Sequence, residues 1–273
     1  MEPKTQLHEK DFENLWKFMY EHYGINLQRK KALIEGRLAL VVEQSGYMNF
    51  HDYVEAVLQS RGGELIENLV SRLTTNYTYF MRESEHYDFM RQVALPEWTG
   101  KIKNGDLRVW SAGCSSGEEP YSIAMTIDEY LGFERAKWDT QILATDISPQ
   151  VLDEAKRGVY PELRLRHLSA VSRARYFTQC GADEWKISDE LASQVVFGQF
   201  NLMDSFEKFR RPFHIIFCRN VMIYFDVKTR NELATKFRDA LEPGGYMFLG
   251  MSEIMSGVRP GFQSVAPAVF RKI

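Results

Sequence analysis

A glycine-containing turn between a strand and a helix is the part of this sequence best suited to chemistry. Residues 109–122 read VWSAGCSSGEEPYS, in which an apolar run meets Gly113 and Gly117 and is followed at once by Glu118 and Glu119. Such a corner of an open α/β sheet holds a cofactor against a helix N-terminus. Two carboxylates would repel a pyrophosphate but suit a cation, and S-adenosylmethionine carries an ammonium and a sulfonium without phosphate. The corner therefore predicts a methyltransferase, although acidic residues also favour the first turn of any helix.

Polar side chains also follow three later strands, at the edge where ligands bind in such sheets. Asp146 ends the second strand, where a carboxylate can accept both hydroxyls of a ribose; alternatively, it forms the Asp-Ile-Ser-Pro turn. Asn201 and Leu202 end the third strand, where an amide and an apolar side chain could hold adenine. Arg219 ends the fourth strand, after an apolar run, and a cation there needs a carboxylate partner or an opening to solvent.

These residues require strands that alternate with helices. The predicted strands are residues 107–112, 141–145, 195–200, 213–218, 246–249 and 269–272. Helices are predicted after Pro120, after Ser148-Pro149 and after Asp226, and the last is expected to stop at Pro243-Gly244-Gly245. This alternation is typical of an α/β fold with a doubly wound, mainly parallel, Rossmann-like sheet. Residues 176–197 interrupt the alternation, which predicts a small inserted antiparallel β-subdomain.

The first 75 residues instead predict an all-helical domain, because apolar residues recur at helical spacing between glycine breaks. One basic cluster stands out in this segment, and Lys30 and Arg37 are seven residues apart on one helix face. The cluster is either a solvated helix edge or a docking surface for an acidic partner; its residues are Arg29, Lys30, Lys31 and Arg37.

Composition narrows the class of protein. A net charge of -3 and a pI near 6.1 argue against nucleic acid as a partner. No apolar run approaches the roughly 18 residues that a membrane-spanning helix needs, and no signal peptide is evident, so we expect no direct membrane insertion. The three cysteines are far apart, which suits a reducing cytoplasm, and the six histidines lack the spacing of a metal site.

Four motifs together resemble the CheR family of chemotaxis-receptor glutamate methyltransferases. They are LTTNYTYFMRE at 73–83, SSGEEPYS at 115–122, ATDI at 144–147 and CRNVMIYF at 218–225, in matching order and spacing over essentially the whole chain. The resemblance implies a receptor-docking helical domain at 1–75, a linker at 76–95 that closes over the cofactor, and a methyltransferase domain at 96–273. It also implies methyl transfer from S-adenosylmethionine to glutamates on the cytoplasmic helices of chemoreceptors, with S-adenosylhomocysteine as product.

The resemblance further implies roles for individual residues. Arg82, Arg219 and Tyr224 are expected at the catalytic centre, with Tyr224 near the transferred methyl group. The expected cofactor contacts are Asn76, Thr78, Arg82, Gly113, Glu118, Glu119, Asp146, Asn201, Leu202, Arg219 and Asn220. The residues do not decide which of Glu118 and Glu119 faces the ligand; register favours Glu118.

Two further readings stay open, and the segment in which some family members bind a receptor pentapeptide is not matched. A non-catalytic S-adenosylmethionine sensor or scaffold of the same fold is the main alternative. A nucleic-acid base methyltransferase is disfavoured because Arg-Asn-Val stands where such enzymes carry an Asn/Asp-Pro-Pro-aromatic motif. The segment Tyr176–Phe197 is shorter than in members that bind a C-terminal receptor pentapeptide, so we do not expect that tether. We expect a monomer.

Overall fold

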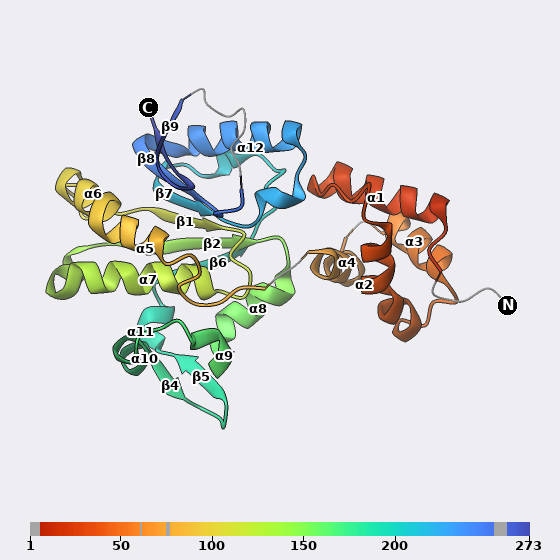
Figure 1. Ribbon diagram of the computed structural model, residues 1–273, viewed down its shortest axis with the longest axis horizontal. Coiled ribbons are helices and arrows are strands. Elements are labelled where there is room, and N and C mark those ends of the chain that lie inside the picture. Colours follow the sequence, from red (N-terminus) through yellow and green to blue (C-terminus); the bar gives the residue numbers. More distant parts are fainter. Residues whose placement is uncertain (1–5, 61, 75–76, 254–260) are drawn as a thin grey trace. The chain divides into compact units, whose positions relative to one another are not determined.

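The computed structural model describes residues 6–60, 62–74, 77–253 and 261–273 (Figure 1). The chain divides into two compact units. The first comprises residues 1–76 together with 223–229, and the second comprises 77–222 together with 230–273. Asn76, an expected cofactor contact, lies outside the described residues.

The described residues of the first unit form four helices, which confirms the all-helical domain that the spacing predicts. They are α1 (Glu9–Tyr23), α2 (Lys31–Gln44), α3 (Phe50–Gln59) and α4 (Glu64–Leu73). Gly24 ends α1 in the left-handed conformation, and the Asn49 side chain caps α3 by accepting from Asp52 N. One apolar face of each helix forms the core, which includes Leu15, Met19, Ile34, Leu38, Phe50, Val54, Leu69 and Leu73.

The second unit is built on a seven-stranded sheet in the order β6-β2-β1-β7-β8-β10-β9. The first five strands are parallel and β10 is antiparallel to both of its neighbours, which confirms the doubly wound, mainly parallel fold. The strands are β1 (Val109–Ala112), β2 (Ile142–Asp146), β6 (Val195–Gln199), β7 (Phe213–Cys218), β8 (Leu241–Leu249), β9 (Phe262–Ala266) and β10 (Val269–Lys272). The sequence did not predict β9, whose three central residues are exposed.

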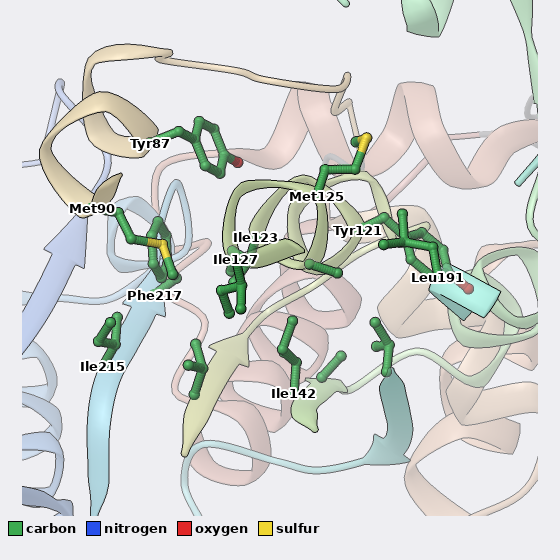
Figure 2. Packing of buried hydrophobic residues seen from close by; sticks show 14 of the residues in the cluster. Tyr87, Met90, Tyr121, Ile123, Met125, Ile127, Ile142, Leu191, Ile215 and Phe217 are labelled. Carbon is green, nitrogen blue, oxygen red and sulfur yellow. The ribbon is translucent and has the colours of Figure 1, made fainter. Parts of the chain in front are cut away.

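Helices cover both faces of this sheet, with α7 (Glu118–Leu131) and α12 (Val227–Ala240) on opposite sides (Figure 1). Side chains of β1 alternate accordingly: the Trp110 ring lies 5.4 Å from Phe237 of α12, whereas Ser111 donates to Glu119 of α7. Figure 2 shows Ile123 and Ile127 of α7 beside the strand residue Ile142. The remaining helices of the main fold are α5 (Glu85–Phe89), the π-helical η1 (Met90–Ala94), α6 (Leu95–Lys101), the 3-10 helix η2 (Gly132–Lys137), α8 (Pro149–Arg157), η3 (Phe206–Lys208) and η4 (Met222–Tyr224).

The small antiparallel sheet begins earlier than the sequence predicts. It was expected at residues 176–197, but its order is β3-β5-β4, with β3 (Val159–Pro161) at one edge, then β5 (Glu184–Ile187) and β4 (Phe177–Gln179). Three residues ending in proline carry no period-2 signal, so β3 escapes a sequence reading. The expected range also took in β6, which pairs with β2 in the main sheet. Helices α9 (Glu162–Leu165) and α10 (Ala170–Tyr176) lie between β3 and β4, and α11 (Asp189–Ala192) leads from β5 to β6 of the main sheet.

Helix α12 begins where the sequence predicts but ends earlier than predicted. Asp226 caps α12 as expected, since its Oδ1 accepts from Thr229 N at 2.8 Å. The helix ends at Ala240, however, and Pro243-Gly244-Gly245 falls inside β8, because pairing with β7 already begins at Leu241.

Within the described ranges, none of the helices has the length and apolar character needed to cross a membrane.

His214 makes the stability of this unit depend on pH. Its ring is buried, and its Nδ1 accepts from Arg108 N at 2.9 Å, which requires an unprotonated nitrogen. Burial and the guanidinium groups of Arg108 and Arg211 lower the pKa of His214 to about 4 from an ordinary 6.5. The folded state therefore favours the neutral ring, and its contribution to stability is complete above pH 6.5 and is lost as the pH falls toward 4.

We predict that His214→Asn flattens this dependence, because the Asn oxygen can accept the same hydrogen bond without titrating. Between pH 7 and pH 5 the wild-type protein should lose about 2 kcal/mol more unfolding free energy than the variant. Urea denaturation at both pH values measures this difference, and contributions from other titrating groups cancel between the two proteins. Equal losses in both proteins would contradict the assignment.

Candidate active site

The carboxyl ends of β1, β2 and β6 meet through their main chains. Gly113 N and Cys114 N both donate to Thr145 O, at 2.7 and 2.9 Å, and Phe200 N donates to Asp146 O at 2.9 Å. These bonds continue the parallel pairing past the last strand residues. They bring the glycine corner, Asp146 and the turn after β6 to one edge of the sheet, as the strand order requires.

Only glycine fits at two positions of the corner. Gly113 has φ 88°, and a Cβ there would lie 2.4 Å from Val221 Cγ2. Gly117 has φ 97°, and a Cβ there would lie 2.9 Å from both Ala155 Cβ and the Tyr160 hydroxyl. The absence of a Cβ therefore lets the segment after β7 approach the corner at Gly113, and lets α8 and β3 approach it at Gly117. Close approach is the usual reason for glycine in such turns.

Asp146 is half-buried, and its carboxylate binds main-chain N–H groups of the corner and of its own turn. Its Oδ2 accepts from Ser115 N at 2.9 Å and its Oδ1 accepts from Ser148 N at 3.1 Å. Burial raises the pKa of Asp146, and these two N–H groups oppose that rise. An ionised carboxylate accepts about four hydrogen bonds, so the Asp146 oxygens retain capacity for hydroxyl donors. The turn-forming and ribose-binding readings of Asp146 are thus compatible.

The turn after β6 is closed by its own polar atoms. Asn201 Oδ1 accepts from Met203 N at 3.0 Å, and its carbonyl accepts from Asp204 N at 2.9 Å. Leu202 is buried. The amide oxygen of Asn201 therefore shapes the turn.

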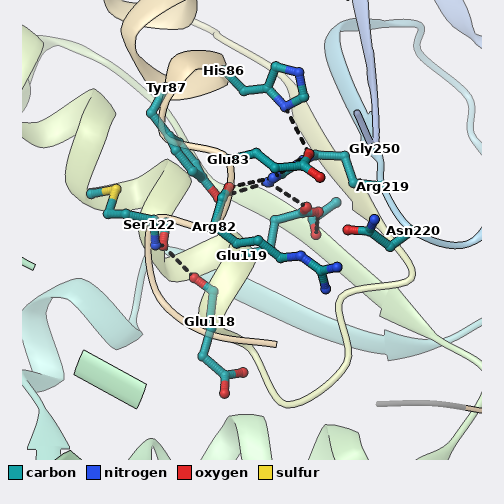
Figure 3. A network of polar contacts seen from close by, with 12 residues as sticks. Arg82, Glu83, His86, Tyr87, Glu118, Glu119, Ser122, Arg219, Asn220 and Gly250 are labelled. Carbon is teal, nitrogen blue, oxygen red and sulfur yellow. Dashed lines mark hydrogen bonds and ion pairs between the residues drawn. The ribbon is translucent and has the colours of Figure 1, made fainter. Parts of the chain in front are cut away.

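Arg219 is the centre of a buried polar cluster (Figure 3). Its Nη2 lies 2.9 Å from Glu83 Oε2, and its Nη1 lies 3.2 Å from Glu119 Oε2 and from the Tyr87 hydroxyl. Its Nη2 also donates to the carbonyl of Arg82. The carboxylate partners that a buried cation needs are therefore present.

The charges of this cluster shift each other's protonation. Burial alone would lower the pKa of Arg219, but Tyr87, Glu119 and Glu83 raise it above the ordinary value. Burial would raise the pKa of Glu83, yet the Arg219 charge and hydrogen bonds hold it below its usual range. Burial dominates at Glu119 and raises its pKa despite Arg219.

The neighbouring carboxylate has an arginine of its own. Glu118 Oε1 accepts from Arg164 Nη1 at 2.9 Å and its Oε2 accepts from Ser116 Oγ at 2.7 Å, with the side chain 1% exposed. The Glu119 side chain is 11% exposed. Both acids of the corner are thus paired with arginines, and exposure favours Glu119 as the one that a ligand can reach.

The segment from Tyr77 to Glu83 joins this cluster through its main chain. Arg164 donates to the carbonyl of Thr78, which is buried, and Met81 N donates to Ser122 Oγ at 3.0 Å. Arg82 Nη1 donates to Tyr77 O at 2.9 Å, and among the described residues Arg82 forms no ion pair. In Figure 3 its guanidinium points toward the side where Asn220 lies.

Unusual backbone conformations gather at the same place. Among the described residues outside glycine, positive φ angles occur at Met81, Glu83, Ser115, Asn220 and Ala268, and the first four belong to the segments just described. Asn220 N donates to Glu253 Oε2 at 2.9 Å, which also accepts from Gly250 N. Such strained residues persist where surrounding contacts over-determine them, typically at functional sites.

The remaining expected residues, Tyr224 and the basic cluster, belong to the first unit. Tyr224 belongs to the 223–229 segment of the first unit, where its carbonyl accepts from Asn26 N at 2.9 Å. Within the basic cluster of that unit, Lys31 pairs with Glu9 at 2.6 Å and Arg37 donates to Leu73 O at 2.8 Å. Arg37 therefore binds the C-terminal carbonyls of α4, and the exposed members of the cluster are Arg29 and Lys30.

Several members of the site were not found from the sequence. The set comprises Glu83, Tyr87, Ser122, Arg164 and Glu253. Glu83 and Arg219 are 136 residues apart, and Arg164 and Glu118 are 46 apart, so no local pattern links them. The available signals were that Glu83 directly follows Arg82 in the 73–83 motif and that Ser122 ends the 115–122 motif.

Comparison with known proteins gives consistent matches. Residues 76–270 match the family model described as "CheR methyltransferase, SAM binding domain", and residues 10–74 match "CheR methyltransferase, all-alpha domain". The chain is 43% identical over 266 residues to a chemotaxis protein methyltransferase of Borreliella burgdorferi, covering 96% of this chain and 94% of that one. It is 37% identical to chemotaxis protein methyltransferase Cher2 of Pseudomonas putida (93% and 94% covered) and 34% identical to the Escherichia coli chemotaxis protein methyltransferase (96% and 90% covered).

We predict that Arg219→Met destabilises the protein by about 3–5 kcal/mol, because it leaves Glu83 and Glu119 buried without a counter-ion. Arg91→Met is the matched control, since the Arg91 side chain is 43% exposed and loss of its ion pairs should change stability by less than about 1 kcal/mol. Denaturant unfolding measures both. Replacing Glu83 and Glu119 by Gln in the Arg219→Met background should restore part of the loss, and equal stability of the two Met variants would refute this account.

Proposed function

Because this chain belongs to the CheR family of S-adenosylmethionine-dependent methyltransferases that act in chemotaxis, we propose that it methylates glutamate side chains of chemoreceptors. The products are glutamate methyl esters and S-adenosylhomocysteine. The observation that carries the proposal is the meeting of the glycine corner, Asp146 and the 201–204 turn at one edge of the sheet. We place this action on the cytoplasmic helices of the receptors, as the sequence resemblance implies.

The residues at this edge fit the donor. In our proposal Asp146 accepts the ribose hydroxyls, Asn201 and Leu202 hold the adenine, and Glu119, with Glu118 behind it, faces the ammonium. The missing side chains of Gly113 and Gly117 let the neighbouring elements approach this corner closely. Further contacts are assigned to Thr78 and Asn220 and, from the resemblance, to Asn76.

The bound donor supplies an activated methyl group, so the protein's task is orientation. A glutamate acceptor is already ionised at neutral pH, with a pKa of about 4.3, and needs no general base. Alignment of reacting groups can in principle contribute up to about 7–11 kcal/mol. Arg219 is paired with two carboxylates, so we assign it a structural role in holding the site together. Arg82 is therefore the arginine we assign to orienting the acceptor carboxylate.

Transfer of label tests the proposed function. The protein is incubated with methyl-labelled S-adenosylmethionine and a receptor signalling fragment, and alkali-labile label on the fragment is measured. Label released as methanol by alkali supports a glutamate ester. Label on nucleic acid, or binding of the donor without any transfer, would overturn the proposal.

We predict that Asp146→Ala weakens binding of S-adenosylhomocysteine by about 1.5–3 kcal/mol, the usual contribution of hydrogen bonds to a charged group. Asp153→Ala is the matched control, because Asp153 is an exposed residue of the adjacent helix α8. Isothermal titration calorimetry on variants with checked thermal unfolding gives the affinities. Equal affinities for both variants would remove Asp146 from the site.

We also predict that Arg29→Glu with Lys30→Glu raises the KM for receptor about two- to fivefold at low salt, since exposed charges steer docking weakly. The effect should shrink as salt rises, because screening acts over about 8–10 Å. Affinity for S-adenosylhomocysteine should not change. The paired control is Lys10→Glu with Lys17→Glu on α1, and an identical KM in the two double variants would place receptor docking elsewhere.

A further inference from the structure

Two tyrosines of the second unit lie among arginines beside the site. The tyrosine–arginine patch consists of Tyr77, Tyr79, Arg82, Arg166 and His167. Tyr79 is its centre: the Arg166 Cζ lies 5.6 Å and the Arg82 Cζ 6.0 Å from the centroid of its ring, and the His167 ring lies 4.7 Å away. Tyr77 is 55% exposed, and its ring centroid lies 6.0 Å from that of Tyr79.

The charges of this patch are not neutralised within the described chain. Arg166 Nε donates to His167 Nε2 at 2.9 Å, and Arg82 Nη1 donates to a carbonyl, but neither guanidinium has a carboxylate partner among the residues that the structure covers. The nearby Arg164 differs, because its charge is met by Glu118. Two guanidinium groups placed over an aromatic ring, without acids, are suited to anionic side chains.

The patch is joined to the residues that we assign to the donor. The carbonyl of Arg82 accepts from Arg219, and Arg164, whose Cζ lies 5.7 Å from the centroid of the Tyr77 ring, links Thr78 to Glu118. Arg166 and His167 follow α9 directly and are exposed. A chain that presents one glutamate to the donor would therefore place its neighbouring side chains near this patch.

We propose that the tyrosine–arginine patch docks acidic side chains that flank the methylated glutamate on the receptor segment. This inference rests on the proposed function, since it requires a glutamate acceptor in an acidic context. Arg166 forms charge-assisted hydrogen bonds to a flanking carboxylate, and the tyrosine rings pack against the aliphatic part of the same side chain. Within the patch, Arg166 thus selects acidic surroundings, whereas Arg82 meets the acceptor itself.

The test is Arg166→Glu, compared with Arg157→Glu, an exposed arginine at the end of α8 that makes the same charge change. The substrate is a receptor signalling fragment in two forms, one native and one with the acidic neighbours of the accepting glutamate changed to Gln. For the native fragment we expect Arg166→Glu to raise KM roughly fivefold at low salt, with kcat and the Kd of S-adenosylhomocysteine unchanged. With the Gln form of the fragment, Arg166→Glu and the wild-type protein should have the same KM. Arg157→Glu should have the wild-type KM with both forms.

Each other outcome overturns the proposal. An equal KM in the two Glu variants shows that the patch does not dock the receptor, and a weaker Kd for S-adenosylhomocysteine assigns it to the donor site. A KM increase that persists with the Gln form shows that flanking acids are not what it recognises. Tighter binding of a single-stranded oligonucleotide than of the fragment would assign the patch to nucleic acid.

The proposed function can fail separately from this inference. Fluorescence anisotropy of the labelled fragment, without donor, reports docking in the absence of methyl transfer. If the wild-type protein binds the fragment but transfers no methyl group, the function fails while the comparison of Arg166→Glu with Arg157→Glu still decides the role of the patch.

Discussion

The buried guanidinium of Arg219 is the constraint on which the site depends. An arginine does not give up its proton in a protein, and an unpaired charge cannot stay buried without a large cost in free energy. Carboxylates must therefore reach it, and they come from two separate segments, Glu119 at the start of α7 and Glu83 after the 77–82 stretch. The end of β7, the first turn of α7 and the polypeptide leading into α5 are held together by this one requirement.

The same requirement explains the strained backbone around the cluster. Met81 and Glu83 have positive φ angles, which turn the chain so that the carbonyl of Arg82 and the carboxylate of Glu83 both face Arg219. Each such residue costs on the order of 1–3 kcal/mol, which the network of contacts must offset. A site arranged in this way is preorganised, which suits a reaction that needs alignment more than proton transfer.

The small sheet is tied to the cofactor corner by two side chains. Tyr160 of β3 donates to Ser116 O at 2.7 Å, and Arg164 of α9 donates to Glu118 and Thr78. The insertion therefore contributes directly to the wall of the site. Arg166 and His167 follow Arg164 closely in the sequence and are exposed, so this part of the insertion reaches from the site to the surface.

The sequence alone determined the alternation of strands and helices, the glycine corner and the polar residues at the strand ends, because these depend on local periodicity and on adjacent positions. It also indicated that Arg219 needed a carboxylate partner or an opening to solvent. Only the tertiary structure decided which carboxylates these are, that Glu118 is neutralised by Arg164, that Arg37 binds the end of α4, and that the small sheet begins at Val159. These pairings join residues tens to more than a hundred positions apart, and such distances are set by how the elements pack, which no local pattern encodes.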